Sequence, residues 1–125
     1  MKVRKMKLNE IFDTIRLQKR YWLFPSFFYF LAKGVLTGKA YVCVDNNETI
    51  VGIAIWSGRR LGTIVVDTNS KGKGIGSLLL KKTEPENPWA ITVGDKKVID
   101  FYIKNGYTVT GRHDKEVKLE KLKSK

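Results

Sequence analysis

A glycine-rich turn between two apolar runs is the part of the chain best suited to chemistry. It joins a strand-like run that ends at Val66 to a helix-like run that begins at Ser77. Such a turn leaves backbone N–H groups free at the start of a helix, where the helix dipole adds positive potential. Three glycines let an anion approach these groups closely, because glycine has no side chain: Gly72, Gly74 and Gly76. Two lysines strengthen the preference for an anion: Lys71 and Lys73. Residues 71–77, here the glycine turn, therefore predict a phosphate site.

Two common nucleotide-binding loops do not fit the sequence. A Walker A loop requires G-x-x-x-x-G-K-[ST], but the nearest candidate, 34–39, has one residue too few between its glycines and is followed by Ala40. A dinucleotide fingerprint requires G-x-G-x-x-G/A near the start of a βαβ unit. Here Gly76 follows Gly74 too closely, and the turn comes after three strand-like runs. A tight turn that binds nothing stays open as an alternative.

Two segments resemble the GNAT superfamily of acetyl-CoA-dependent N-acetyltransferases. The first, VVDTNSKGKGIGSLLL, is similar to the family's R/Q-x-x-G-x-G/A motif, with Lys71 at the R/Q position and Gly74 and Gly76 at the small positions. The second, VGDKKVIDFYIKNGYTVTGR, is similar to the family's second motif, which ends in [FL]-Y-x-x-x-G-[FY]. Residues 101–107 match that ending. Both motifs occur in the family's order, and the resemblance covers roughly residues 40 to 122.

The resemblance implies acetyl-CoA as a cosubstrate and an amine as its acceptor. The family holds the diphosphate of coenzyme A on the amides of the glycine turn, here Lys71, Gly72, Lys73, Gly74, Ile75, Gly76 and Ser77. The pantetheine arm runs beside the preceding strand and bonds its main chain, here Ile64, Val65 and Val66. An amide of that strand can also polarise the thioester carbonyl.

Tyr102 matches the family's general acid. A tyrosine has an ordinary pKa of about 10 and a thiol one of about 8.5, so at neutral pH the phenol is protonated and can hydrogen-bond to a departing thiolate. The same position in the helical period also suits a core tyrosine.

The general base is less visible in the sequence. No acid lies on the expected strand 61–66, where the family often has a glutamate base. Asp67 is the nearest carboxylate, and His113 is expected between the last two strands. A water chain, or no dedicated base, is equally consistent with the sequence.

The elements predict an α/β fold in the order β-α-α-β-β-β-α-β-α-β-β, within a single domain of residues 1–125. The resemblance implies a mixed, mostly antiparallel central sheet flanked by helices. Asp95 and Gly106 predict the two ends of the last helix. The expected strands are 1–7, 40–44, 49–56, 61–66, 89–93, 107–110 and 117–122, and the expected helices are 10–19 (with Asn9 as N-cap), 26–36, 77–82 and one from 95.

The cysteine count and the apolar stretches indicate the compartment of the protein and whether it binds a metal or enters a membrane. The single cysteine, Cys43, cannot form an internal disulfide, and no Cys/His cluster has metal-ligand spacing, so we expect a cytoplasmic protein without a metal. The apolar stretch 21–32 is too short to span a bilayer and contains a proline, so we expect no membrane segment. A monomer or a homodimer is expected.

The acceptor stays open. A net charge of +12 favours polyanionic partners, although it also suits simple solubility. The hypotheses are an N-acetyltransferase for a small amine, a peptide N-terminus or a lysine; an enzyme that acts on a nucleic-acid-linked amine such as aminoacyl-tRNA; and a non-catalytic module that binds coenzyme A or nucleic acid. One aromatic cluster suits an acceptor pocket, a core or a dimer interface: Tyr21, Trp22, Phe24, Phe27, Phe28, Tyr29 and Phe30.

Overall fold

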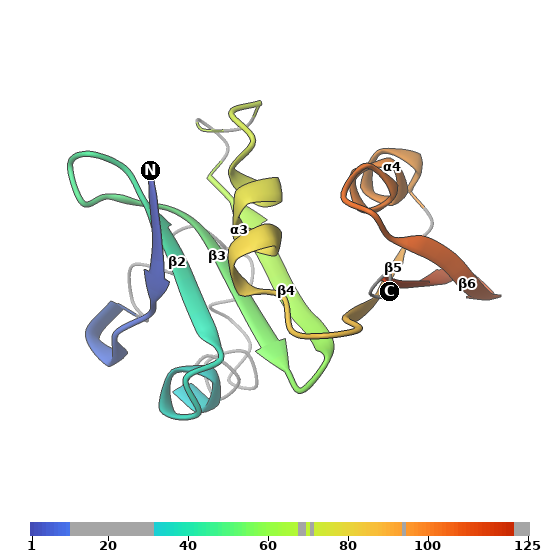
Figure 1. Ribbon diagram of the computed structural model, residues 1–125, viewed down its shortest axis with the longest axis horizontal. Coiled ribbons are helices and arrows are strands. Elements are labelled where there is room, and N and C mark those ends of the chain that lie inside the picture. The colour runs from blue at the N-terminus through green and yellow to red at the C-terminus, as the bar shows by residue number, and fades with distance from the viewer. Residues whose placement is uncertain (11–31, 68–69, 71, 94, 122–125) are drawn as a thin grey trace.

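Seven strands form one sheet in the order β1-β2-β3-β4-β5-β7-β6 (Figure 1). The computed structural model describes residues 1–10, 32–67, 70, 72–93 and 95–121. The strands are β1 (Lys2–Lys5), β2 (Ala40–Val44), β3 (Ile50–Ser57), β4 (Arg60–Val66), β5 (Trp89–Val93), β6 (Thr108–His113) and β7 (Glu116–Glu120). The helices are η1 (Leu8–Glu10), a segment over 32–36, α3 (Ile75–Thr83) and α4 (Lys96–Lys104).

The predicted fold class is confirmed. Every strand pair is antiparallel except β4 with β5. β2 and β5 have the predicted bounds, and the other strands differ only at their ends. Helix 10–19, most of helix 26–36 and the aromatic cluster 21–30 lie outside the described residues.

The placement of His113 between the last two strands was wrong. His113 is the final residue of β6 and pairs with Glu116 of β7. The reason is the short hairpin: only two residues separate the strands, and Asp114 takes a left-handed φ of 56° there. Asp and Asn tolerate that conformation better than most residues do. Both strands therefore extend further than the side-chain pattern indicated.

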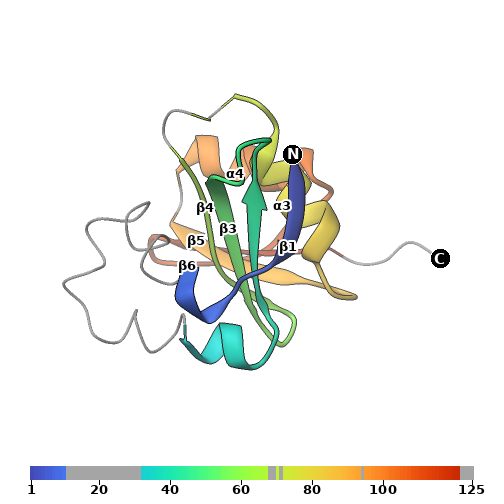
Figure 2. The same cartoon turned by 90° about the vertical axis from the view of Figure 1, so that its left-hand side faces the viewer.

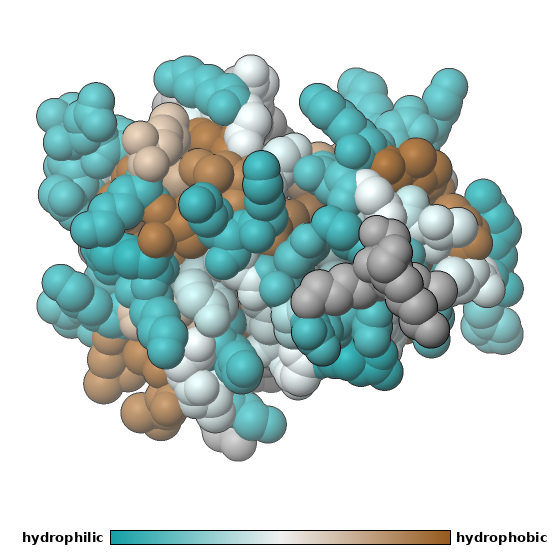
Figure 3. All heavy atoms as spheres, viewed as in Figure 1, coloured by the Kyte–Doolittle hydropathy of each residue, from teal (hydrophilic) through white to brown (hydrophobic). Residues whose placement is uncertain are grey.

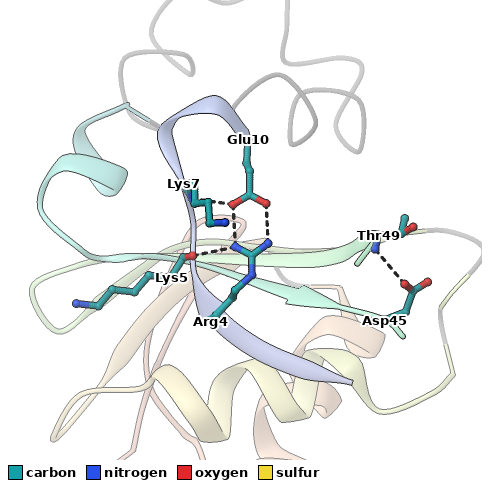
Figure 4. Close-up of polar contacts among 6 residues, drawn as sticks. All are labelled: Arg4, Lys5, Lys7, Glu10, Asp45 and Thr49. Carbon is teal, nitrogen blue, oxygen red and sulfur yellow. Dashed lines mark hydrogen bonds and ion pairs between the residues drawn. The ribbon is translucent and has the colours of Figure 1, made fainter. Parts of the chain in front are cut away.

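One ion pair fixes the start of the chain against the sheet (Figure 4). The Arg4 guanidinium donates two parallel hydrogen bonds of 2.8 Å to the Glu10 carboxylate, and the Lys7 backbone N–H donates a third, also of 2.8 Å. The hydrogen bond from Arg4 is the main cause that lowers the pKa of Glu10. This bidentate geometry is the stronger form of a carboxylate–guanidinium contact, and it ties η1 to β1.

The first four strands carry apolar layers on both faces. On one face, the helix over 32–36 packs against a core that includes Ile53 and Ile55. On the other face, α3 packs through Leu79 against Cys43 and Ala54. Figures 1 and 2 show α3 lying over this face of the sheet. A Cβ at Gly52 would lie only 2.9 Å from Cδ1 of Leu79, so glycine at this point of β3 lets α3 lie close to the sheet.

β4 and β5 meet at one end and diverge from there (Figure 1). Among the described residues their parallel pairing is limited to Arg60 with Trp89, supported by the Trp89 N–H donating to the Arg59 carbonyl at 2.9 Å. α4 covers an apolar cluster that includes Ala90, Val117 and Leu119 and that Leu80 of α3 also joins. Among the described residues, the edge of β4 that faces β5 has no strand partner over most of its length.

In the part of the chain that the structure describes, no helix combines the length and apolar character needed to cross a membrane. Hydrophilic side chains cover most of the face that carries α3 and α4, with hydrophobic patches between them (Figure 3).

Candidate active site

The glycine turn leads directly into α3. Gly74 is the N-cap residue with a left-handed φ of 75°, and no side chain caps the helix. The first hydrogen bond of the helix runs from the Leu78 N–H to the Gly74 carbonyl at 3.0 Å. The preceding N–H groups, from Gly74 to Ser77, therefore have no partner within the helix. Lys71 lies outside the described residues.

The three glycines of the turn have different surroundings. Gly72 and Gly74 have φ values of 85° and 75°, and a Cβ on either would have no atom of the described residues within 4 Å apart from its chain neighbours. A Cβ on Gly76 would instead lie 3.1 Å from both Cε1 and Cζ of Phe101 in α4. Gly72 and Gly74 thus keep a left-handed, open turn that fits an anionic group such as a diphosphate, whereas Gly76 allows α4 to pack against the start of α3.

The main chain of β4 presents alternate groups at its free edge. The Asp67 N–H donates to the Val51 carbonyl at 2.8 Å, so Val65, two residues earlier, also directs its main-chain groups toward β3. Ile64 and Val66 therefore direct theirs toward the opposite edge, where β5 has diverged. Cγ2 of Val66 would lie 3.8 Å from a Cβ on Gly76, while the Val65 side chain packs against the core on the other face of the sheet.

Tyr102 lies on the inner face of α4 and is only 6% exposed. Burial raises the pKa of its phenol to about 12, so the phenol is protonated at neutral pH. Its ring packs edge to face against Phe101 at 5.3 Å and against Tyr107 at 5.4 Å between centroids. Tyr102 belongs to a buried cluster that also includes Leu80 of α3, and Ile64 of β4 packs against that same cluster.

The two ends of α4 are fixed as the sequence indicates. The Asp95 side chain accepts a hydrogen bond of 2.8 Å from the Lys97 N–H at the helix start. Gly106 takes a φ of 94° just after the C-cap residue Asn105. These caps set where the helix begins and ends, and with it the position of Tyr102 relative to the sheet.

A family model described as an acetyltransferase (GNAT) domain matches residues 37–109, which is more than half of the chain. The chain belongs to the GNAT superfamily. The resemblance of the two motifs is thereby confirmed, and the matched span contains the glycine turn, the free edge of β4 and all of α4.

One curated relative and two solved structures are similar to this chain. The peptidyl-lysine N-acetyltransferase YjaB of Escherichia coli (strain K12) is 27% identical over 77 residues, 59% of this chain and 52% of its own length. The chain thus spans about half the length of the curated relatives it matches. A GNAT-family acetyltransferase of Bacillus cereus superposes with a TM-score of 0.82 at 15% identity, over 99% of this chain and 98% of that one. The PaiA N-acetyltransferase of Thermoplasma acidophilum, solved with coenzyme A, gives 0.75 at 15% identity, over 98% of each.

The two side chains considered as a base differ in position within this GNAT fold. Asp67 is half-buried at the end of β4, where its carbonyl accepts a hydrogen bond of 2.9 Å from the Ser70 N–H and closes the turn. His113 is exposed at the tip of the β6–β7 hairpin. Because Val93 of β5 pairs with Glu116 beside it, the hairpin tip lies at the same end of the sheet as the carboxyl end of β4.

Sequence reasoning missed a polar contact behind Tyr102. The Tyr107 hydroxyl donates to Oε2 of Glu84 at 3.0 Å, and Nζ of Lys121 contacts Oε1 of the same carboxylate at 2.5 Å. Burial is the first cause that raises the pKa of Tyr107, and Glu84 raises it further. Glu84 is the C-cap residue of α3. No local pattern marks this contact, because its members are 23 and 37 residues apart.

Proposed function

We propose that this chain transfers an acetyl group from acetyl-CoA to an amine. The observation that carries the proposal is the open glycine turn at the start of α3, beside the unpaired edge of β4 and the α4 that carries Tyr102. Free N–H groups and two left-handed glycines suit the diphosphate, and an unpaired strand edge suits the amide-rich pantetheine arm. GNAT membership and the coenzyme A complex of the PaiA enzyme support the same cosubstrate.

Different groups of the chain would bind the diphosphate and the pantetheine arm of acetyl-CoA. N–H groups of Gly74, Ile75, Gly76 and Ser77 would bind the diphosphate, with Gly72 and the side chain of Lys73 nearby. Main-chain groups of Ile64 and Val66 would hold the arm as an added strand and direct the thioester toward α4. Acetyl-CoA itself supplies an activated acyl group, so the protein needs to orient it, polarise its carbonyl and assist the departing sulfur.

The transfer would proceed by direct attack. The neutral amine nitrogen attacks the thioester carbon, a C–N bond forms, and the C–S bond breaks as the thiolate leaves. The nitrogen loses one proton and the sulfur gains one, so the reaction is balanced without another reactant. The pKa of Tyr102, raised to about 12, lies well above the thiol value of about 8.5. Tyr102 would therefore stabilise the thiolate mainly by donating a hydrogen bond, and the proton would come in the end from the nitrogen.

A lysine side chain within a peptide is the acceptor we propose to test first. The support is the similarity to YjaB, a peptidyl-lysine N-acetyltransferase that the chain matches over about half of that protein's length. A nucleic-acid-linked amine is the second candidate, favoured by the net charge of +12. The buried free thiol of Cys43 supports a reducing, cytoplasmic compartment for either reaction.

The test is a turnover assay with defined acceptors. The protein is incubated with acetyl-CoA and a panel of lysine peptides, peptides with free N-termini, small polyamines and aminoacyl-tRNA. Thiol release is followed by a thiol reagent, and the acylated product is identified by mass spectrometry. We expect thiol release that depends on one acceptor class and is inhibited by added coenzyme A. Thiol release at the no-protein rate with every acceptor would overturn the proposal.

A further inference from the structure

Three aromatic rings form a continuous row through the active-site side of α4. Phe101 packs edge to face on Tyr102, at 5.3 Å and 71°, and Tyr102 packs edge to face on Tyr107, at 5.4 Å and 70°. This aromatic row places the Tyr102 ring between two others. Edge-to-face contacts have preferred geometry, so a ring held on both sides has little freedom to shift.

Both ends of the aromatic row contact α3. At one end, the Phe101 ring lies against the first turn of α3, where a Cβ on Gly76 would come within 3.1 Å of it. At the other end, the Tyr107 hydroxyl donates to the carboxylate of Glu84, the C-cap residue of the same helix. The row therefore spans α3 from its first turn to its last. The first turn is also where the cosubstrate's diphosphate is proposed to bind.

We propose that Phe101 and Tyr107 are positioning residues that set the distance between the glycine turn and the Tyr102 hydroxyl. The proposal rests on the proposed function and extends it to two residues beyond those assigned to the diphosphate and the sulfur. α3 carries the diphosphate site at its N-terminus, and α4 carries the phenol. The aromatic row is a packed connection between them, within the cluster that Leu80 of α3 also joins, so a shift of either end moves the phenol relative to the bound thioester. Misplacement by about 1 Å can reduce a rate by about 100-fold.

The contact at Gly76 is what separates this role from ordinary core packing. Phe101 is only half-buried, and it meets α3 at a position where a Cβ would lie 3.1 Å from its ring, a tight contact. Val66, on the free edge of β4, lies at the same place, 3.8 Å from that Cβ position. The Phe101 ring thus adjoins both segments proposed to hold the cosubstrate, the first turn of α3 and the end of β4.

The experiment compares kcat with KM for acetyl-CoA in matched variants of the full chain. Phe101→Leu removes the two ring atoms that approach Gly76, and Tyr107→Phe keeps the ring but removes the contact with Glu84. We expect kcat to fall by about tenfold in the first variant and about threefold in the second, with KM for acetyl-CoA changed by less than about threefold. Ile103→Ala, a 50% exposed position on the same helix, is the control and should keep both constants.

A rescue experiment tests the contact itself. Gly76→Ala places a methyl group against the Phe101 ring and should lower kcat, whereas Gly76→Ala combined with Phe101→Leu should be more active than Gly76→Ala alone. Independent, multiplying losses in the double variant would contradict a shared contact. Ring carbon signals of Tyr102 in labelled protein give a readout without turnover. They should shift when coenzyme A is added to the wild type and shift less in Phe101→Leu, even if that variant is less stable.

The outcomes distinguish this proposal from the proposed function. If the wild type neither binds coenzyme A nor acetylates any acceptor, the proposed function fails and the positioning role fails with it. If the wild type is active and both Phe101→Leu and Tyr107→Phe keep kcat within about twofold, only the positioning role is overturned.

Discussion

Two glycines of the glycine turn and the central tyrosine of the aromatic row lie at opposite extremes of burial. Gly72 and Gly74 are exposed, and among the described residues no atom other than their chain neighbours would touch a Cβ on either of them. Tyr102 is 6% exposed, with a ring on each side. The first region offers main-chain groups, and the second offers one side chain whose surroundings are filled.

This difference indicates which changes each region can accept. Backbone N–H groups bind an anion whatever the side chains are, provided that the main chain keeps its left-handed turns and nothing blocks the approach. A phenol acts only from one position, so its neighbours matter as much as its own chemistry. Coenzyme A affinity should therefore fall when the turn is blocked, and kcat should fall when the aromatic row changes.

Gly74→Glu should give the largest effect. It places a carboxylate at the helix N-cap, where it would repel the diphosphate, and coenzyme A affinity should fall by at least about 100-fold in calorimetry. Gly74→Ala is the matched control, because it imposes the same left-handed strain without charge. Affinity lost equally in both variants would contradict an electrostatic cause.

Tyr102→Phe should separate the rate from binding. The ring and its packing remain while the hydroxyl is removed, so coenzyme A affinity should be unchanged and kcat should fall by about 100-fold. Tyr41→Phe, on a half-buried tyrosine of β2, serves as the control. An unchanged kcat in Tyr102→Phe would leave Tyr102 as a core residue only.

Gly76→Ala should be costlier for stability than Gly111→Ala, at an open position in extended backbone. The new methyl group would meet the Phe101 ring at 3.1 Å, so we expect a loss of about 1–3 kcal/mol in the free energy of unfolding. At Gly111 the nearest atom to a new Cβ would be 3.9 Å away, and Gly111→Ala should cost less. Equal losses in denaturant titrations would remove the distinction between packed and open glycines.

The smallest expected effect is on the pH dependence of the free energy of unfolding. Burial raises the pKa of Tyr102 from about 10 to about 12, so the folded protein keeps this phenol protonated after the unfolded chain has begun to lose its proton. The contribution of the protonated Tyr102 phenol to the free energy of unfolding is complete below about pH 10 and is lost as the pH rises toward 12. Between about pH 9 and about pH 11 the wild type should lose about 1 kcal/mol more unfolding free energy than Tyr102→Phe. If the unfolding free energies of the wild type and Tyr102→Phe changed with pH in parallel, water would reach the Tyr102 phenol freely in the folded protein.

Much of the fold followed from local patterns in the sequence. Apolar β-branched runs bounded by turn residues gave the bounds of β2 and β5, and Asp95 and Gly106 gave the ends of α4. These features depend on neighbouring residues alone, so the sequence displays them. The extension of β6 to His113 depends instead on a two-residue hairpin that the side-chain pattern did not reveal.

The candidate site was only partly predictable for the same reason. The glycine turn is contiguous, and its motif identified it. The role of Gly76 depends on Phe101, which is distant in sequence, and the anchoring of Tyr107 depends on Glu84 at the far end of α3. Such contacts follow from how α3 and α4 pack, and no periodicity within either helix encodes them.

The most direct test of the central claim is an amide NMR titration with coenzyme A. If the glycine turn holds the diphosphate, the backbone N–H signals of Gly72, Lys73, Gly74, Ile75, Gly76 and Ser77 should shift most, together with those of Ile64 and Val66. Phosphate-free pantetheine should shift only the latter two. Shifts concentrated in any other segment, with the turn unaffected at saturating coenzyme A, would contradict the account.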